Sequence, residues 1–348
     1  MTYVGQRCHD DAVGAASYEI RRAGADDRPA IISLCERSLD WKSHDPNAAF
    51  YAWKHDDNPW GASPTWVAVT PGGEIIGLRA FLRWRFKDAA GTSFDAVRAV
   101  DTATDPAFQG QGIFSRLTLG ALPKITEDGV AFVFNTPNER SRPGYLKMGW
   151  AERGIVPAAV RLANLHGLPR IAASRSSAEL WSLDCAHGQA AGDFFDTASV
   201  ERLISVQSAP TAVTTELSIA HLRWRFGFDP LKYRIVNVGD DPDEGVVIFR
   251  LRRRAKATEF VIALVLTHPQ TTAHKLRACI RQGLRATNAD YALATTGTFG
   301  SAMAAARIGF IQIPKLGPVL TTRSLREHGS TVDPPKSFRF SLGDIELF

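Results

Sequence analysis

The sequence predicts an α/β protein made of two tandem copies of one α/β unit. Its 348 residues exceed the roughly 250–300 residues at which a single hydrophobic core stops growing. Strand and helix patterns alternate along the first half, and several of these patterns occur again, in the same order, in the second half. Patterns that recur in the same order indicate an internal repeat, and we expect the boundary between its two copies near residue 165.

Local patterns place elements along most of the first half. Alternating or continuous apolar residues predict strands at 17–22, 65–70, 74–86, 94–102 and 130–135. Helical spacing and end signals predict helices at 29–39, 47–55, 113–128 and 139–148. A Pro-Gly-Gly turn at 71–73 joins two of the strands as a hairpin.

Four correspondences in the same order support the repeat. Trp53 stands six residues before Pro59, and Trp224 stands six residues before Pro230. Each pair is followed by an aromatic-led strand and then by a long apolar strand. Further on, two similar strands each lead through a helix to a glycine and an aromatic residue: Phe132–Asn135 with Gly149-Trp150, and Tyr291–Thr295 with Gly309-Phe310.

The composition excludes several classes of protein. The chain is 45% hydrophobic and 22% charged, which is typical of a globular protein and not of a disordered or fibrous one. No apolar run approaches the roughly 20 residues of a membrane span, and residues 1–17 have the character of a flexible leader and not of a secretory signal. The four scattered cysteines form no metal motif and fit a reducing cytoplasm, so we expect a cytoplasmic protein without a metal. A net charge of +5 is too small to indicate a nucleic acid partner.

A glycine-containing segment joins a predicted strand to a predicted helix. It reads Asp105-Pro106-Ala-Phe-Gln109-Gly110-Gln111-Gly112-Ile113-Phe114. The first amides of a helix lack intrahelical partners and favour an anion, and glycine lets a phosphate approach the backbone. The segment lacks the Gly-Lys-Ser/Thr of a nucleotide triphosphatase loop and the third glycine of a dinucleotide fold. By itself it is equally consistent with a tight turn and with a phosphate site.

A second segment downstream decides between these two interpretations. Asn138 stands seven residues before Tyr145, and Tyr145 stands four residues before Gly149-Trp150. Together the segments resemble the GNAT N-acetyltransferase superfamily. Gln109-x-x-Gly112 matches its Q/R-x-x-G-x-G/A loop, and the second segment matches its N-x-x-A-x-x-x-Y-x-x-x-G-F helix. Phe114 departs from the pattern, because the family usually has glycine or alanine there.

The resemblance covers about residues 18–165 and implies both a fold and a site. Each unit would have a mixed, mostly antiparallel central sheet flanked by helices, which is an α/β (α+β) class. Acetyl-CoA or another acyl-CoA would be the cosubstrate, and a primary amine of a small molecule would attack its thioester directly. Tyr145 would be the general acid for the leaving thiolate. The cofactor-binding residues implied are Thr102, Ala103, Thr104, Gln109, Gly110, Gln111, Gly112, Ile113, Phe114, Ser115, Asn138 and Ser141.

The base and the acceptor site are less well defined by the sequence. Asp101 lies on the strand that would hold the thioester, so it is the candidate base, with Asp95 and Glu139 as weaker alternatives. The mycobacterial "enhanced intracellular survival" acetyltransferases look similar and suggest the terminal carboxylate of Phe348 as a further alternative. An acidic and aromatic group after the first helix suggests the acceptor site: Trp41, His44, Asp45 and Tyr51.

The second half lacks the site. Its loop reads Thr267-His-Pro-Gln-Thr-Thr-Ala-His274, without glycine, and it has no counterpart of Tyr145. We therefore expect a leader at 1–17, an active GNAT unit at 18–165, a degenerate unit at 166–330 and a tail at 331–348 that adds a strand to the sheet. Two other functions stay open, a Fem-type aminoacyl-tRNA-dependent transferase and a non-catalytic CoA-binding protein. The sequence leaves monomer and homodimer open.

Overall fold

The structure is a computed structural model that describes residues 17–164, 168–172, 177–195, 198–207, 212–325 and 338–346. The predicted leader falls almost entirely on residues outside these ranges, as does Phe348. The chain forms two compact units. Unit 1 comprises Met1–Phe86, Phe94–Arg153 and Leu320–Lys336, and unit 2 comprises Lys87–Ser93, Gly154–Val319 and Ser337–Phe348.

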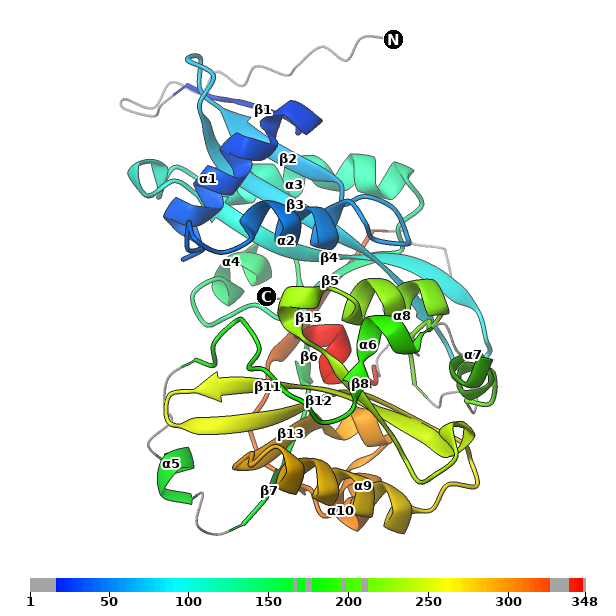
Figure 1. The fold of residues 1–348 in the computed structure, drawn as a ribbon. Helices are drawn as coiled ribbons and strands as arrows, with labels where there is room; N and C mark the ends of the chain where they lie inside the picture. The colour runs from blue at the N-terminus through cyan, green and yellow to red at the C-terminus, as the bar shows by residue number, and fades with distance from the viewer. Residues whose placement is uncertain are drawn as a thin grey trace. The chain divides into compact units, whose positions relative to one another are not determined.

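Unit 1 is built on a mixed sheet with the strand order β1-β2-β3-β4-β5-β15-β6 (Figure 1). The strands are β1 (Glu19–Arg22), β2 (Thr65–Val69), β3 (Ile75–Lys87), β4 (Ser93–Thr104), β5 (Phe132–Asn135), β15 (Val319–Ser324) and β6 (Ala151–Ile155). The pairs β1–β2, β2–β3 and β5–β15 are antiparallel, whereas β4 and β5 run parallel. The strands predicted in the first half are therefore present, within a few residues of the expected limits.

Helices cover both faces of this sheet. They are α1 (Arg28–Ser38), α2 (Asn47–His55), α3 (Ile113–Glu127) and α4 (Arg142–Lys147), and Figure 1 shows α1 and α2 in front of the strands and α3 behind them. One buried cluster joins α1 and α2 to β2, β3 and β4, and includes Leu34, Tyr51 and Ala103. A second cluster joins α3 and α4 to the opposite face, and includes Leu117 and Tyr145.

Unit 2 contains a second mixed sheet with the order β14-β7-β13-β12-β11-β10-β8. Its strands are β14 (Ile311–Gln312), β7 (Ala158–Leu162), β13 (Tyr291–Thr295), β12 (Ala257–Thr267), β11 (Gly245–Arg254), β10 (Arg234–Asn237) and β8 (Gln189–Ala190). Its main helices are α7 (Ala198–Ser205), α8 (Ile219–Phe226), α9 (Ala273–Ala286), α10 (Ala302–Ile308) and α11 (Leu342–Ile345). Shorter turns of helix are α5 (Leu168–Ala172), α6 (Ala191–Phe194) and η6 (Thr296–Phe299).

The two sheets share one arrangement. Each has a single long antiparallel hairpin, β3–β4 or β11–β12, whose second strand pairs in parallel with the next strand of the chain, β5 or β13. In each sheet the strand beyond that one comes from a distant part of the chain, β15 in unit 1 and β7 in unit 2. The predicted fold class is confirmed, with two mostly antiparallel mixed sheets flanked by helices. The tandem repeat itself, with limits at 18–165 and 166–330, stays a prediction.

The tail differs from the strand expected at 331–348. Its described part makes one bridge, between Val213 and Phe338, and then forms the short helix α11. Ser341 and Asp344 explain the helix, because they form a capping box in which Asp344 accepts from the Ser341 amide at 2.6 Å. The alternating pattern of the tail reflects burial of Phe340 and Ile345 and not a continuous ladder.

Candidate active site

The glycine loop lies between β4 and α3 and leaves backbone amides free for a ligand. Asp105 starts it by accepting from the Ala107 amide at 3.0 Å. Gly110 and Gly112 have φ angles of 80° and 74°, and no other group lies within 4 Å of the position that a Cβ would take. The first intrahelical bond of α3 runs from Arg116 N to Gly112 O, so the preceding amides have no partner within the helix. The loop is therefore open above its backbone, as an anion site requires.

Two glutamines flank this loop. The Gln109 side chain turns back to the Thr104 carbonyl, with its Nε2 at 3.5 Å from that oxygen. The Gln111 Oε1 atom is buried and has no hydrogen-bond partner among the residues that the structure describes.

Phe114 connects the glycine loop to α4. Its ring lies against Gly144, where an added Cβ would come within 2.9 Å of the Phe114 Cε1 atom. It also meets the Tyr145 ring edge-on, at 5.4 Å between centroids. The bulky residue at 114 is thus accommodated by a glycine on the neighbouring helix, and it brings α4 against the start of α3.

Tyr145 points into the core, where its hydroxyl meets a buried arginine. The Nη1 atom of Arg79 donates to the Tyr145 oxygen at 2.8 Å, and two further guanidinium nitrogens donate to Thr118 Oγ1 at 3.0 and 2.9 Å. The guanidinium also lies over the rings of Phe114 and Tyr145, at 5.0 and 5.4 Å from their centroids. Among the described residues no carboxylate pairs with Arg79, although its side chain is completely buried.

Arg79 was not among the residues predicted for the site. The only signal in the sequence is a single charge inside the apolar run Ile75-Ile-Gly-Leu-Arg79-Ala-Phe-Leu82. Strand alternation places this position on the face that carries α3 and α4, but nothing local names Tyr145 as its partner.

The end of β4 separates from β5 at the site. The parallel pairing covers Ala96–Arg98 against Phe132–Phe134, and β4 continues beyond it to Thr104. This final stretch contains Thr102, Ala103 and Thr104, three of the residues predicted to bind the cofactor. These three residues lie past the last paired residue of β4, so their backbone N–H and C=O groups on the β5 side do not pair with β5.

Asp101 lies at an irregularity of β4. Its φ angle of 43° is positive, which is uncommon for a residue with a side chain. Ala99 packs in the cluster with α3, whereas Ala103 packs in the cluster with α1 and α2. Residues four apart on a regular strand share one face, so the alternation is broken at Asp101. The irregularity turns the Asp101 side chain toward α2.

Two side chains of α2, a lysine and a histidine, meet the Asp101 carboxylate. Lys54 Nζ lies 2.9 Å from Oδ1, and His55 Nε2 lies 2.7 Å from Oδ2. All three side chains are buried, with 7% or less of each exposed. Burial alone would raise the pKa of Asp101, but Lys54 and His55 outweigh it and hold the pKa well below its usual range. A carboxylate held in this way is a weak base, so the geometry does not favour the base role predicted for Asp101.

His55 completes this cluster as a neutral imidazole. Burial lowers its pKa, and the bond to Asp101 offsets that effect only in part. Because the carboxylate can only accept, Nε2 carries the proton, and Nδ1 is left buried without a partner among the described residues. The sequence indicated Lys54 and His55 only as the end of a helix.

The other predicted cofactor residues make local contacts. Asn138 Oδ1 accepts from the amides of Arg140 and Ser141 at 3.1 and 2.9 Å, and from Ser141 Oγ at 3.0 Å. Both residues therefore shape the turn into α4. Of the weaker base candidates, Glu139 is exposed, and Asp95 forms a partly exposed pair with Arg85 at 2.8 Å.

The four residues predicted for the acceptor site do not form one cluster. Tyr51 is buried in the core, and its ring lies against His55 at a tilt of 47°, with 4.6 Å between ring centroids. Trp41 is half-buried against Phe50, at 5.4 Å between centroids. His44 is largely exposed, with Nε2 at 3.7 Å from an Asp45 oxygen. Tyr51 is thus a core residue, whereas His44 is exposed and Trp41 and Asp45 are half-buried.

The sequence of unit 1 also matches a known family. Residues 19–153 match the sequence model of the acetyltransferase (GNAT) domain. Residues 19–153 form a GNAT acetyltransferase domain. The match contains the glycine loop, the irregular end of β4 and Tyr145. A comparison with curated proteins finds no matching relative.

Solved structures show the same fold over most of the chain. A GCN5-related N-acetyltransferase from Anabaena variabilis is 12% identical, with a TM-score of 0.63 over 89% of this chain and 73% of that one. A probable N-acyltransferase from Enterococcus faecalis is 11% identical, with a TM-score of 0.64 over the same shares. Eis1 from Mycobacterium abscessus is 15% identical, with a TM-score of 0.52 over 88% of this chain and 73% of that one. At these identities the likeness establishes the fold only.

No three histidine, cysteine, aspartate or glutamate side chains among the described residues stand close enough to hold a metal ion. None of their helices is both long and apolar enough to cross a membrane. Within the GNAT domain, the loop at 109–115, Phe114, Tyr145 and Arg79 come together on one face, whereas Asp101 faces the opposite helices.

Proposed function

We propose that the chain is an acyl-CoA-dependent N-acyltransferase that moves an acetyl group to a primary amine of a small molecule. The observation that supports this best is the contact chain from the open glycine loop through Phe114 to the Tyr145–Arg79 pair. It joins an anion site to a proton-bearing hydroxyl inside one GNAT domain. We place the protein in the cytoplasm, without a preference between monomer and homodimer.

The residues of unit 1 fit acetyl-CoA. The free amides at 110–115 suit its pyrophosphate, and the unpaired edge of β4 at Thr102–Thr104 suits the amides of its pantetheine arm. Asn138 and Ser141 lie at the start of α4 and support that helix from the loop before it. Bound acetyl-CoA supplies the activated thioester that an amine attacks.

Tyr145 suits the acid role because its oxygen already accepts a bond from Arg79. The hydroxyl hydrogen is therefore free to be donated, and the adjacent guanidinium stabilises the phenolate that remains. A buried cation without a described carboxylate partner is costly unless negative charge develops beside it. Arg79 is accordingly a positioning residue that acts through Tyr145.

Asp101 is assigned a structural role in this proposal. Its bonds to Lys54 and His55 hold the irregular backbone of β4, and with it the edge at Thr102–Thr104. A free alkyl amine has a pKa near 10 and must lose a proton before it attacks. Because the pKa of Asp101 is held low, Asp101 is a poor acceptor for the proton of the amine. We therefore propose that water molecules take up this proton.

The test is a screen of primary amines for release of free CoA from acetyl-CoA, followed by a tyrosine comparison. With an accepted amine, we expect Tyr145→Phe to lower kcat by at least about 10-fold with little change in acetyl-CoA affinity, as loss of a general acid predicts. Tyr18→Phe is the matched control, because the Tyr18 hydroxyl is buried without a described partner and lies in the same cluster. Equal rates for Tyr145→Phe and wild type would contradict the acid role.

Two outcomes would favour the alternatives. Binding of acetyl-CoA in calorimetry without turnover of any amine would indicate a non-catalytic CoA-binding protein. Salt-sensitive binding of tRNA without binding of acetyl-CoA at millimolar concentration would indicate a Fem-type transferase and remove the proposal. The open glycine loop favours the CoA-dependent reaction over both.

The tandem repeat belongs to the same proposal. Lys54 on α2 directly follows Trp53, and Arg225 on α8 directly follows Trp224, so each stands after the tryptophan of its proposed repeat. Both basic side chains are completely buried. The loop of the second half remains without glycine, so we propose that unit 2 does not hold acetyl-CoA.

A further inference from the structure

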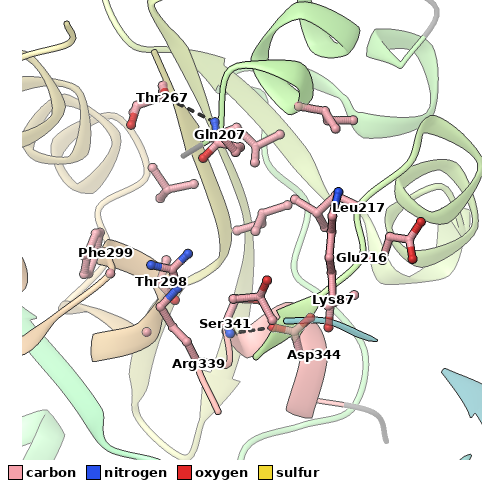
Figure 2. Close-up of a pocket in the computed structure, with 18 of the residues that line it drawn as sticks. Lys87, Gln207, Glu216, Leu217, Thr267, Thr298, Phe299, Arg339, Ser341 and Asp344 are labelled. Atoms are coloured by element: carbon pink, nitrogen blue, oxygen red, sulfur yellow. Dashed lines mark hydrogen bonds between the residues drawn. The ribbon is translucent and has the colours of Figure 1, made fainter. Parts of the chain in front are cut away.

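Unit 2 contains a cavity of about 570 Å³, all of whose lining residues belong to that unit. This volume lies within the range of small-molecule sites, roughly 300–1,000 Å³. Figure 2 shows Thr298, Phe299 and Arg339 on one side and Lys87, Leu217 and Glu216 on the other.

The cavity lies where β12 and β13 separate. Their parallel pairing covers Glu259–Val261 against Tyr291–Leu293, and an extra residue near Ala263 then interrupts the ladder between β11 and β12. Leu264–Thr267 and Gly297–Gly300 line the cavity beyond this point. The place in the sheet corresponds to the separated end of β4 in unit 1, but the loop that follows β12 lacks glycine.

The C-terminal segment forms the floor of the cavity and carries Arg339 into it. The Phe340 carbonyl approaches Gly297 so closely that an added Cβ would stand 2.3 Å from it. Thr295 Oγ1 donates to the same carbonyl at 2.5 Å. The Arg339 side chain then runs over Gly297 and Gly300, and its Nη1 atom lies 3.6 Å from the position of a Gly300 Cβ. Two glycines on η6 and the turn after it thus make room for this arginine.

Arg339 has no ion pair or side-chain hydrogen bond to any residue that the structure describes. Arg339 itself is half-buried. Burial lowers the pKa of its guanidinium, and the nearby Asp344 carboxylate offsets this effect only in part. The five N–H donors of a guanidinium fit a carboxylate or phosphate. A half-buried arginine that faces a cavity without a partner is the donor set of an anion site.

The carboxylates that line the cavity are placed differently. Asp344 is buried and accepts from the Ser341 amide at 2.6 Å and from Ser341 Oγ at 2.7 Å, so it serves the helix cap. Asp88 accepts from the amides of Ala90 and Thr92, both at 2.9 Å, so it serves its own turn. Glu216 lies on the side opposite Arg339 in Figure 2, and its Oε2 atom is buried without a hydrogen-bond partner among the described residues. The half-buried apolar side chains of Ile204, Leu217 and Leu264 complete the walls. The cavity therefore offers the Arg339 guanidinium on one side, Lys87 and Glu216 on the other, and a group of half-buried apolar side chains.

We propose that this cavity binds a small amphiphilic anion, with its carboxylate or phosphate on Arg339 and its apolar part against Leu217, Leu264 and Phe299. The site is separate from the acetyl-CoA site proposed in unit 1. Because the loop after β12 lacks glycine, the anion is a compact head group and not a pyrophosphate.

Calorimetry with the full chain tests this proposal, using hexanoate and hexyl phosphate as the two anionic probes and hexanol as the neutral one. We expect one of the anions to bind with one-to-one stoichiometry and at least about 10-fold more tightly than hexanol, since hydrogen bonds between two charged groups are stronger than those of a neutral hydroxyl. Arg339→Gln should reduce that preference to less than threefold. Excess CoA should not displace the probe.

Arg307→Gln is the matched control, because Arg307 is exposed on α10 outside the cavity and its one side-chain hydrogen bond among the described residues is to Met303 Sδ, at 3.8 Å. It should leave probe affinity unchanged. The proposal is overturned if neither anion binds, if Arg339→Gln binds them as wild type does, or if CoA displaces them. Arg339→Lys keeps the charge and should restore part of the affinity, which separates loss of the anion contact from a folding defect.

Discussion

At the scale of single residues, the charges inside unit 1 decide more than the charges on its surface. Lys54, His55 and Asp101 form one buried group with contacts of 2.9 and 2.7 Å. Breaking a buried pair is far more costly than breaking an exposed one, because it leaves an uncompensated charge away from water. This group therefore provides a direct test of how β4 is held.

Asp101→Asn should lower the free energy of unfolding by about 3 kcal/mol, since it removes the carboxylate that pairs with Lys54 in the core. Urea denaturation at pH 7 measures the change. Asp95→Asn is the control, because its pair with Arg85 is partly exposed, and we expect a loss below about 1 kcal/mol. Adding Lys54→Met to Asp101→Asn should restore part of the stability. Equal losses in the two aspartate variants would contradict the assigned role.

His221 predicts a pH dependence in unit 2. Burial, with a contribution from Arg225, lowers the pKa of His221 to about 3. Below the unfolded value of about 6.5, the unfolded chain gains a proton that the folded chain does not, so stability is present above that pH and falls as the pH drops toward 3. The slope is about 1.4 kcal/mol per pH unit, which amounts to about 2 kcal/mol between pH 7 and pH 5.

Urea denaturation of wild type and His221→Gln at these two pH values measures this contribution. The variant should be less stable at pH 7 but should lose about 2 kcal/mol less than wild type on acidification. His55, whose pKa is also lowered by burial, is unchanged in both proteins and supplies the same slope to each. Parallel losses in the two proteins would show that His221 does not titrate in this way.

At the scale of elements, the glycine loop links backbone conformation to ligand binding. Gly112→Ala should cost about 1 kcal/mol of stability because its φ angle of 74° is unfavourable for alanine, and it should weaken acetyl-CoA binding at least about fivefold. Gly73→Ala carries the same type of strain, with a φ angle of 84° in an open turn away from the site. Calorimetry should show normal acetyl-CoA affinity for Gly73→Ala. Equal affinities for both variants would remove the loop from the cofactor site.

The helices α2 and α8 each carry a buried basic side chain, and the two side chains have different partners. Lys54 bonds to the carboxylate at the irregular end of β4, whereas Arg225 donates to the backbone carbonyls of Gly343 and Glu346 at 2.6 and 2.7 Å. The buried cation of unit 1 is thus bound by a strand residue, whereas the buried cation of unit 2 is bound by the C-terminal segment. This contact also holds the segment that presents Arg339.

At the scale of the whole molecule, each sheet depends on a strand from a distant part of the sequence. β15 pairs with β5 in unit 1, where Thr321 Oγ1 donates to Asn135 Oδ1 at 2.5 Å. β7, which follows the GNAT domain along the chain, pairs with β13 in unit 2. The two compact units are therefore not two consecutive stretches of sequence.

This arrangement predicts that a fragment of residues 1–165 does not fold stably. It lacks β15, so the edge of β5 is unpaired and β6 loses its neighbour in the sheet. Circular dichroism and urea denaturation should show no cooperative transition for the fragment, or one weaker than that of the same fragment joined by a flexible linker to residues 316–326. A fully cooperative fragment without the added strand would contradict this account.

Much of the fold was predictable because its signals are local. The turn at 71–73, the helix at 47–55 and the strand at Tyr291–Thr295 depend on neighbouring residues, and the structure places them as expected. The exchange of β7 and β15 was not predictable, since strand pairing across such distances leaves no mark in either segment. Within the described part of the tail, a capping box between Ser341 and Asp344 begins the short helix Leu342–Ile345, which its alternating pattern did not indicate.

The sequence by itself determined the nature of the candidate site. Gly110 and Gly112 stand in a local strand–glycine–helix pattern, and Tyr145 was indicated by the resemblance of its segment to the GNAT family. Only the tertiary structure decided their partners. Arg79 lies 66 residues from Tyr145, and Lys54 lies 47 residues from Asp101. Such contacts are made by folding, and burial then sets which groups hold a proton, because the charge of a buried side chain depends on what the fold packs beside it.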